Sequence, residues 1–543
     1  MPLKRSYWKP AVIGIVAVAS GGWLLQQGSD GNVYVKMRML QDVVRTVSDR
    51  YVDEVDPTEL YDLAIEGLLE RLGDPHSNLL RPEDYSDLRL QTTGNYGGLG
   101  IRIDEKDGWI TVVQTLPKTP AERAGLRPGD RIVEVDGVSS RSWTPDDAVQ
   151  VLRGPKGSPV NIKISRIGVP DLIPVEIVRD EIHVEYVTGF MYEDGIGYIL
   201  HQQFSERSAD DIRLLVDELT AEGMKGLIFD LRGNPGGLLD EGVAVSDLFL
   251  NRGNEVVETR SRIADQNDTY RATRKPIDPD LPVIVLVDGF SASASEIVAG
   301  ALQDHDRALV LGTRTFGKGS VQTLFPLSGG NYLKLTTAKW YTPSGRSIQR
   351  DRDLDMVALA VPEEQLEDGP DRNALGDAVR EVYYTDAGRE VFGGGGINPD
   401  LVVHGDTLLS VERQFRSELG QDIPAYSDAV FRFSVAYANE HPSLRPDFEV
   451  TDAMFDELYA WITDSGIEVR IDLYEGSERL IHRELGIQLA TVAFDSEDST
   501  RRRLVLDRQV ATAAQLLRES QTQNRLFALA EERQDEEQAV HQN

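Results

Sequence analysis

The sequence predicts a multidomain α/β protein, and three observations support this fold class. Between residues 195 and 302, buried apolar runs, glycine turns and helical patterns follow one another, which is typical of an α/β layer. Residues 94–180 instead form a smaller module that is rich in strand patterns. Apolar residues at helical spacing occupy the chain before residue 93 and after residue 405. The 543 residues are enough for several domains, each with its own core.

The composition limits which partners the protein can bind and which side chains can serve as nucleophiles or metal ligands. Acidic residues outnumber basic ones by 90 to 57, and the formal net charge is −33. A chain this acidic repels phosphate backbones, so no nucleic-acid partner is expected. It has no cysteine, which excludes disulfides, a thiol nucleophile and thiolate metal sites. No His-Glu-x-x-His run is present either, which disfavours a zinc peptidase. We expect neither a metal nor another cofactor.

Residues 1–30 are predicted to be a signal peptide or a membrane anchor. Three basic residues precede a short apolar run at residues 11–19, which is the layout of a secretory signal. Even when it is extended to Leu25, the run is shorter than the roughly 20 residues that span a bilayer. Both outcomes predict an exported protein of the periplasm or cell envelope, because the basic residues stay inside.

Residues 31–93 are predicted to form a helical N-terminal segment. One amphipathic helix is expected through Met39, Val43 and Val47, and a second helix begins at Pro57. The second helix ends before the Gly-Asp-Pro-His-Ser run at residues 73–77, where a turn is expected.

Residues 94–180 resemble a PDZ domain in the order of their elements. These elements are a strand at 110–113, a helix and turn at 120–130, a hairpin at 131–137 and a helix that begins at Thr144-Pro145. The resemblance implies that an extended peptide adds to the strand after a glycine-rich loop, whose backbone N–H groups hold the terminal carboxylate. The loop consists of Gly98, Leu99, Gly100 and Ile101. Arg153 either contacts the protein body and reports peptide occupancy or is a plain surface arginine.

Residues 181–404 are predicted to form the α/β core. Strands are expected at 195–204, 226–231 and 283–287, with helices between them. A glycine-rich turn follows the second of these strands. An acidic segment at 351–386 lacks periodicity and is expected to be a surface insert.

The strand at 283–287 ends at a serine-rich turn before a helix. Ser293 lies in the middle of this turn, close to the start of the helix. The first N–H groups of a helix have no partner within it and carry partial positive charge, so they can hold an oxyanion formed beside a serine. A purely structural interpretation stays open, because Ser293 and Glu296 also fit a capping box.

A lysine between two glycines follows this helix, at Lys318. In an apolar pocket, desolvation would lower the pKa of its amine and make it a usable base near neutral pH. Gln322 lies four residues later, shares a face with Lys318 in a strand or a helix, and can hold the amine in place. A serine activated by such a lysine needs no histidine.

Both segments resemble the carboxyl-terminal processing proteases, also called tail-specific proteases, a Ser-Lys peptidase family. The resemblance rests on the runs SASASEIVAGALQDH and GTRTFGKGSVQT. It implies that Ser293 is the nucleophile, that Lys318 is the base and that Gln322 supports the lysine.

The same resemblance implies an oxyanion hole. The turn DLRGNPGG at residues 230–237 would supply one backbone N–H, and Ala294 would supply a second. The sequence does not distinguish between Gly236 and Gly237 as the first donor.

These expectations describe a serine endopeptidase of the cell envelope with an α/β peptidase core and an inserted PDZ domain that recognises C-terminal tails. The expected partners are protein or peptide substrates with a free C-terminus and a second copy in a homodimer. The membrane is a further partner if the N-terminal segment is an anchor. A catalytically inactive PDZ-containing scaffold or adaptor is the alternative, because residue types alone do not show activity.

Two other classes of enzyme fit parts of the sequence. Residues 312–318 match the first seven positions of a P-loop, but Gly319 stands where a serine or threonine would bind Mg²⁺, and a strand pattern follows. A Ser-His hydrolase would use His201 or His305, the histidines nearest in sequence.

Residues 405–543 are predicted to form a helical C-terminal extension. Helical patterns cover residues 431–436 and 455–462, and the chain ends in an acidic tail. The family resemblance fades beyond Leu401, so the expected role in dimerisation or substrate access has no motif behind it.

Overall fold

The computed structural model describes residues 33–350, 380–494 and 496–541. The expected signal or anchor at residues 1–30 and most of the acidic insert therefore lie outside the described residues. The chain divides into two compact units, of which the first comprises the residues up to Tyr85 together with 322–336, and the second the remainder. Over the described ranges, no helix combines the length and apolar character needed to cross a membrane.

The first unit contains the predicted N-terminal helices. They are α2 (Val33–Arg50) and α3 (Pro57–Arg71), and the second is capped by Asp56, whose side chain accepts the Thr58 N–H. A short strand, β1 (Asn78–Leu80), pairs antiparallel with the first residues of β18 (Tyr332–Tyr341). Neither β1 nor α4 (Pro82–Thr93), which begins in this unit, was expected from the sequence.

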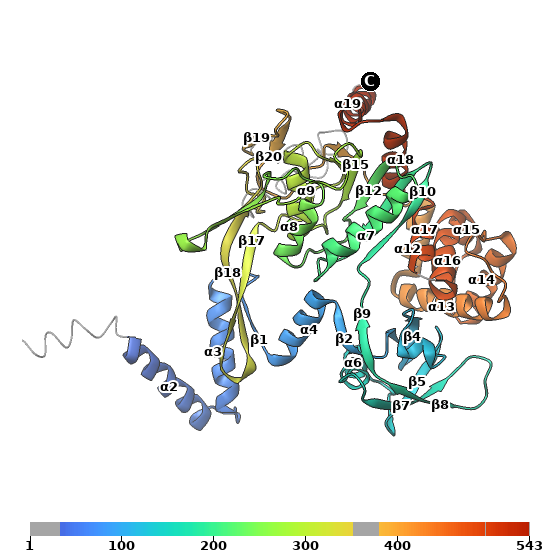
Figure 1. The fold of residues 1–543 in the computed structure, drawn as a ribbon. Helices are drawn as coiled ribbons and strands as arrows, with labels where there is room; N and C mark the ends of the chain where they lie inside the picture. The colour runs from blue at the N-terminus through green and yellow to red at the C-terminus, as the bar shows by residue number, and fades with distance from the viewer. Residues whose placement is uncertain (1–32, 351–379, 495, 542–543) are drawn as a thin grey trace, which may run out of the picture. The chain divides into compact units, whose positions relative to one another are not determined.

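The predicted PDZ module is present in the second unit (Figure 1). Its elements are β2 (Asn95–Gly98), β3 (Ile101–Lys106), β4 (Trp109–Thr115), α5 (Pro120–Arg123), β5 (Arg131–Val135), β6 (Val138–Ser139), α6 (Pro145–Leu152), β7 (Pro159–Ser165), β8 (Ile173–Val178) and β9 (Asp180–His183). Strands β3, β4, β5, β7 and β8 form one sheet, and β2 pairs with β9. Helix α6 begins as predicted, with Thr144 and Asp147 forming a capping box.

A six-stranded sheet with the order β10-β11-β12-β15-β16-β21 forms the core of the second unit. The strands are β10 (Val187–Glu193), β11 (Ile196–His201), β12 (Gly226–Asp230), β15 (Val283–Val287), β16 (Leu309–Gly312) and β21 (Leu401–Val402). All neighbours are parallel except β10 and β11. Ligand sites of such sheets lie beyond the carboxyl ends of the parallel strands.

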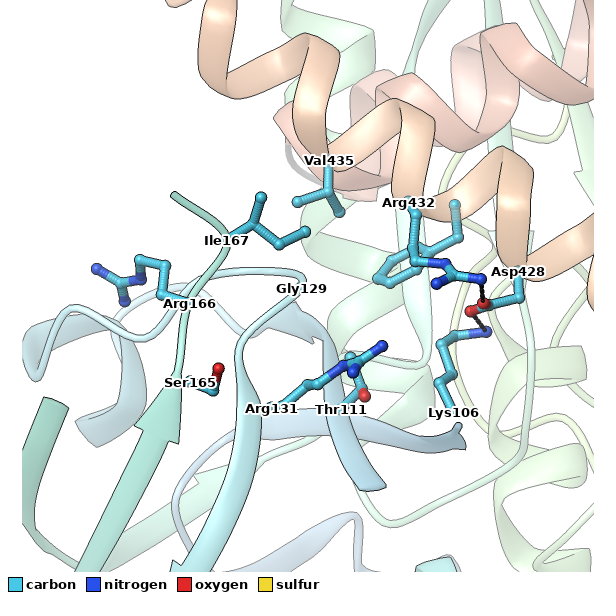
Figure 2. Close-up of a pocket in the computed structure, with 11 residues that line it drawn as sticks. Lys106, Thr111, Gly129, Arg131, Ser165, Arg166, Ile167, Asp428, Arg432 and Val435 are labelled. Atoms are coloured by element: carbon cyan, nitrogen blue, oxygen red, sulfur yellow. Dashed lines mark ion pairs between the residues drawn. The ribbon is translucent and has the colours of Figure 1, made fainter. Parts of the chain in front are cut away.

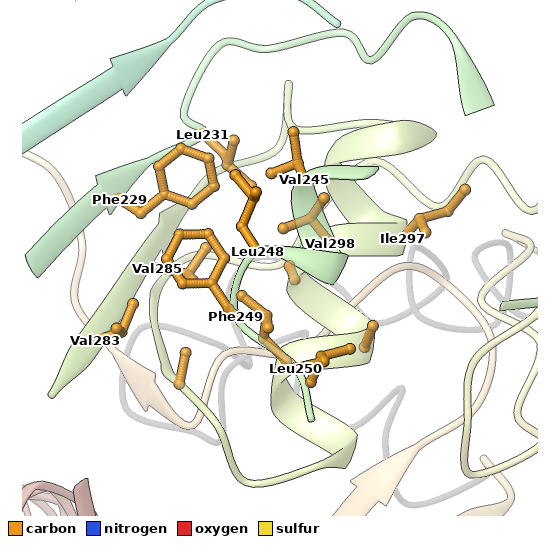
Figure 3. Close-up of a cluster of buried hydrophobic side chains, with 14 of the residues drawn as sticks. Phe229, Leu231, Val245, Leu248, Phe249, Leu250, Val283, Val285, Ile297 and Val298 are labelled. Carbon is orange, nitrogen blue, oxygen red and sulfur yellow. The ribbon is translucent and has the colours of Figure 1, made fainter. Parts of the chain in front are cut away.

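One face of this sheet is covered by helices α7 (Ser208–Ala221), α8 (Leu239–Asp247) and α9 (Ala294–Asp304). Side chains alternate along each strand, so Val283, Val285 and Val287 pack on this face. Figure 3 shows Val285 beside Phe249 and close to Leu248, two residues that directly follow α8.

The opposite face is covered by the last helices of the chain. Ile284 and Leu286 of β15 pack there with residues of α18 (Arg508–Glu519) and α19 (Gln523–His541). Figure 1 shows these two helices, in dark red, beside the core strands. The final part of the predicted extension is therefore an integral layer of the core rather than an appendage.

The rest of the C-terminal region forms a separate helical cluster with its own core. Its helices are α12 (Ser410–Leu419), α13 (Ile423–Glu440), α14 (Asp452–Asp464), α15 (Ile471–Gly476) and α16 (Glu478–Ala493), and α17 (Ser496–Leu504) connects it to α18. The two predicted helical patterns correspond to α13 and α14.

A second sheet contains β13 (Glu255–Ser261), β14 (Asp268–Arg271), β18 and β17 (Ser320–Pro326), together with β1. The described end of the acidic insert is not a bare loop, because β19 (Val382–Tyr384) pairs with β20 (Glu390–Phe392).

Candidate active site

The serine-rich turn lies where β15 ends and α9 begins, at the carboxyl edge of the parallel strands. Asp288 follows the strand and accepts the N–H groups of Gly233, Phe290 and Ser291 on one carboxylate oxygen, at 2.9 to 3.0 Å. This carboxylate holds the turn after β15 against the glycine-rich turn after β12.

The structure separates the three serines of the turn by their roles. Ser291 and Ser295 are fully buried, and their hydroxyl groups donate to the backbone carbonyls of Leu231 and Asn234 at 2.8 and 3.0 Å. Ser293 is only half-buried, and its φ of +56° is in the left-handed region that residues with a Cβ rarely adopt. Its hydroxyl makes no capping hydrogen bond. Of the three, Ser293 is the one that is not fully buried and whose hydroxyl donates to no described backbone carbonyl.

Glu296 connects this turn to the segment that carries the lysine. The carboxylate is fully buried, and one oxygen accepts the Thr315 hydroxyl at 2.6 Å and the Gly317 N–H at 2.7 Å. The other oxygen accepts the backbone N–H of Ser293 at 2.8 Å and that of Lys318 at 2.9 Å. The capping interpretation was therefore correct for the bond from the Ser293 N–H to the Glu296 carboxylate, which is half of a capping box. It did not include the bonds from Thr315, Gly317 and Lys318.

This shared oxygen fixes the distance between the backbones of the two predicted catalytic residues. Since the Ser293 and Lys318 nitrogens bond to the same atom, they cannot lie farther apart than those two bond lengths placed end to end. Lys318 is half-buried, and its carbonyl accepts the indole N–H of Trp340 at 3.1 Å. Its backbone is thus fixed from both sides beside the serine turn.

Burial raises the pKa of the Glu296 carboxyl. The hydrogen bonds from Thr315, Lys318, Gly317 and Ser293 act in the opposite direction, because each favours the ionised form. A carboxylate with all its donors in place is costly to disturb, since removing it would leave several buried N–H groups unsatisfied.

The two glycines that the sequence could not distinguish differ in their hydrogen bonds. The Gly236 N–H donates to the side chain of Asn234 at 2.9 Å. No acceptor within the described part of the chain bonds the N–H of Gly237 or that of Ala294. A Cβ on Gly236 would lie 2.8 Å from the Ser293 Cβ and 3.0 Å from the Ala294 nitrogen, so the turn passes directly beside the serine. The free donors favour Gly237 with Ala294.

Gln322 lies in β17, where its amide donates to the Thr336 hydroxyl at 3.3 Å. It belongs to the first compact unit and Lys318 to the second, and support of the lysine by Gln322 stays a prediction.

The predicted carboxylate loop of the PDZ module connects β2 and β3. Leu99 is buried, and Gly100 has a φ of +79° and packs so closely on Thr119 that a Cβ would meet it at 2.3 Å. The carbonyls of Leu99 and Gly100 accept the N–H groups of Ala121 and Leu116, both at 2.9 Å. Gly98 and Ile101 end β2 and begin β3, so the loop is rigidly held.

Arg153 is not a plain surface arginine. Its guanidinium lies 5.1 Å from the Tyr96 ring and 3.2 Å from the Asp87 carboxylate of α4. It therefore ties the end of α6 to the segments that lead into the PDZ module.

The geometry does not fit the two rival enzyme classes. The His201 ring is buried against Phe204, and burial lowers its pKa to about 3. The His305 ring bonds Asp386, Asn254 and the Glu255 carbonyl, so neither histidine bonds a serine. A P-loop is followed by a helix, whereas Lys318 precedes strand β17.

Two cavities lie beside the PDZ module. The first, of about 270 Å³, separates it from α13 and is bordered by Lys106, Asp428 and Arg432. Figure 2 shows Lys106 and Arg432 converging on Asp428, at 3.4 and 2.7 Å. The second, of about 720 Å³, lies among the ends of β11 and β12, the PDZ strands and helices α16 to α18.

Comparison with family models gives three matches along the chain. Residues 195–356 match peptidase family S41, and residues 111–166 match the PDZ domain. Residues 23–83 match the activating protease CtpB N-terminal domain.

Full-length relatives agree with these matches. The chain is 43% identical over 327 residues to a carboxy-terminal-processing protease of Bartonella bacilliformis, covering 59% of this chain and 74% of the relative. It is 34% identical over 340 residues to carboxy-terminal processing protease CtpA of Bacillus subtilis, covering 63% and 72%. Among solved structures, the photosystem II D1 C-terminal processing protease is 30% identical, with a TM-score of 0.34 over 57% of this chain and 90% of that one.

Proposed function

Because the chain belongs to the carboxy-terminal processing proteases of peptidase family S41, which are serine-type peptidases, we propose that it cleaves protein tails with a Ser293–Lys318 dyad. The observation that carries the proposal is the Glu296 oxygen that accepts the backbone N–H groups of both residues. A carboxylate in this position keeps the backbones of the proposed nucleophile and base beside each other, which such a dyad requires.

In the proposed reaction, the neutral Lys318 amine takes the Ser293 proton and the alkoxide attacks the carbonyl carbon of the scissile bond. The N–H groups of Ala294 and Gly237 hold the oxyanion of the tetrahedral intermediate. Lys318 then gives its proton to the leaving amine, and water hydrolyses the acyl-enzyme with Lys318 again as base. No metal takes part in these steps.

The test compares the wild type with Ser293→Ala, Lys318→Ala and Lys318→Arg on a library of peptides with free C-termini, read by mass spectrometry. All three variants are expected to lose turnover, because arginine keeps the charge and length of the lysine but does not give up its proton. Loss of turnover in Ser291→Ala or Ser295→Ala at unchanged thermal stability would contradict the nucleophile assignment. Gln322→Ala tests the predicted support of the lysine and is expected to lower kcat.

Recognition of tails by the PDZ domain is part of the same proposal. The domain is present, and its glycine-rich loop at residues 98–101 is of the kind that binds a terminal carboxylate. Amidation of the peptide C-terminus is therefore expected to raise KM and to leave kcat nearly unchanged. An equal KM for free and amidated peptides would contradict tail recognition.

Action in the cell envelope is proposed from the sequence of residues 1–30, with three basic residues before a short apolar run. Fusion of this segment to a reporter that is active only after export tests it. Absence of reporter activity would contradict export.

A further inference from the structure

The 720 Å³ cavity contains two arginines with no acidic partner. Arg102 comes from β3 of the PDZ module, and Arg503 comes from α17 of the C-terminal region. Neither guanidinium takes part in an ion pair or hydrogen bond with any described residue. The other arginines of the cavity are paired, Arg232 with Asp230 and Asp507 at 2.6 and 2.8 Å, and Arg483 with Asp406 at 3.1 Å.

The two unpaired guanidinium groups are close enough to interact. Burial lowers the pKa of Arg503, and the positive charge of Arg102 lowers it further. Two facing cations destabilise each other unless an anion lies between them. The lack of an acidic partner is notable in a chain with 90 acidic residues against 57 basic ones.

The cavity also touches the catalytic turns. Gly233 and Asp288 border it, and they are joined by the 3.0 Å hydrogen bond that holds the two turns together. Three residues beyond Gly233, a Cβ on Gly236 would lie 2.8 Å from that of Ser293. The cavity thus reaches the carboxyl edge of the sheet, at the two turns between which Ser293 is held.

Arg102 links this cavity to peptide capture. It follows Ile101 at the start of β3, the strand to which a captured peptide is expected to add. Ile101 and Ile103 pack on the PDZ core, and since side chains alternate along a strand, Arg102 points to the other side. The cavity borders this strand at Arg102 and the two turns at Gly233 and Asp288, and its volume suits a peptide segment.

We propose that Arg102 and Arg503 form a subsite that binds a carboxylate of the substrate peptide, and so favours tails that carry a negative charge near the cleaved bond. Arginine is suited to this ligand because its planar donors match the two oxygens of a carboxylate. The inference rests on the proposed protease function and adds a determinant of specificity. Arg503 lies outside the residues that match the peptidase family, so the preference is supplied partly by this chain's own C-terminal region.

The test uses matched peptides with the same free C-terminus and cleavage site that differ by one Glu or Gln, moved through the positions around the cleaved bond. The wild type is expected to show a KM about tenfold lower for the Glu peptide at one or two positions, at similar kcat. The double variant Arg102→Gln/Arg503→Gln is expected to lose this ratio and to cleave the Gln peptide normally. Arg252→Gln, an exposed arginine elsewhere in the same unit, is the control.

The carboxylate has two sources, an acidic side chain or the terminal carboxylate. Amidated versions of the same peptides distinguish them. If only the PDZ loop binds the terminus, amidation raises KM by the same factor in the wild type and in the double variant. A larger cost in the wild type assigns the terminal carboxylate to the arginine pair. The proposal is overturned if amidation raises KM equally in both proteins and the double variant keeps the Glu-to-Gln ratio of the wild type.

A binding readout keeps this test separate from the proposed catalytic residues. Fluorescence anisotropy of the labelled peptides on the Ser293→Ala background measures the Glu-to-Gln ratio without turnover. If the wild type cleaves the Gln peptide normally and replacing the two arginines does not change the Glu-to-Gln ratio, the subsite is refuted and the proposed reaction is not. A charge preference in binding with no cleavage by the wild type refutes the proposed reaction and leaves the subsite standing.

Discussion

Each face of the central sheet is covered by its own buried apolar cluster, but the two faces differ in what they support. The face under α8 and α9 leads directly into the turn that holds the proposed nucleophile, and its last buried residues adjoin Ser293 and Glu296. The face under α18 and α19 carries none of the proposed catalytic residues, yet it buries as complete a layer of the same strands. In this chain the proposed chemistry therefore depends on one face, whereas folding depends on both.

Removal of the second covering layer is expected to have the largest effect. A chain that ends after Asp507 lacks α18 and α19, which bury residues including Val510, Leu516, Leu517, Leu526 and Leu529. Each such side chain contributes about 1.5–3 kcal/mol, so these five together contribute about 8–15 kcal/mol, which is as large as the usual stability of a domain of about 5–15 kcal/mol. We expect no cooperative melting of the peptidase core by calorimetry. A truncated chain that melts like the wild type would make these helices an appendage.

A matched pair of substitutions measures how much each face contributes to stability. Leu248 packs on the first face and Leu517 on the second, where a Cβ on Gly226 of β12 would lie 3.1 Å from it. Replacing either leucine with alanine is expected to lower the free energy of unfolding by about 2–5 kcal/mol, measured in urea. A loss below about 1 kcal/mol for Leu517→Ala alone would show that the second layer is loosely held.

Glu296→Gln separates chemistry from folding on the first face. Its amide keeps the size of the carboxylate but places an NH₂ group against donors such as the Ser293 and Lys318 N–H groups. The serine and the lysine are then displaced, and we expect kcat to fall about 100-fold. Kinetics with a parallel thermal melt measure this. Unchanged kcat would show that Glu296 does not position the dyad.

The smallest expected effect depends on pH and concerns His201 of the first face. Burial lowers its pKa from 6.5 to about 3, so the folded protein excludes a proton that the unfolded chain binds. Its contribution to stability is therefore complete above pH 6.5 and is lost as the pH falls towards 3. When the pH is lowered from 7 to 5, the free energy of unfolding, measured in urea, is expected to fall by about 2 kcal/mol less in His201→Phe than in the wild type. Equal losses would contradict this assignment.

The sequence predicted the first face better than the second for a physical reason. The apolar run Val283–Val287 forms β15 within the bounds expected, because a strand buried on both faces has a simple local pattern. Helical periodicity also identified α13 and α14, but it shows only that a helix has an apolar side and not what that side contacts. The packing of α18 on β12 joins distant parts of the chain and has no local signal.

The same limit applies to the site. The serine turn and the lysine segment were identified from motifs, and the choice of Ser293 over its neighbours agrees with their burial. The four hydrogen bonds of Glu296 could not be predicted, because three of the donors, in Thr315, Gly317 and Lys318, lie beyond the helix and only the fold brings them there. The pair Arg102 and Arg503 was missed for the same reason, since no local motif distinguishes either arginine and the two lie 401 residues apart in the chain.

The packing of Leu517 beside Gly226 has a consequence for biosynthesis. A polypeptide emerging from the ribosome N-terminus first completes all six strands before the helices that cover their second face exist. Until then that face is open to solvent, and contacts between such distant segments form slowly. The newly made chain therefore passes through an interval in which it is prone to aggregation, and this interval ends only when its last helices have been synthesised.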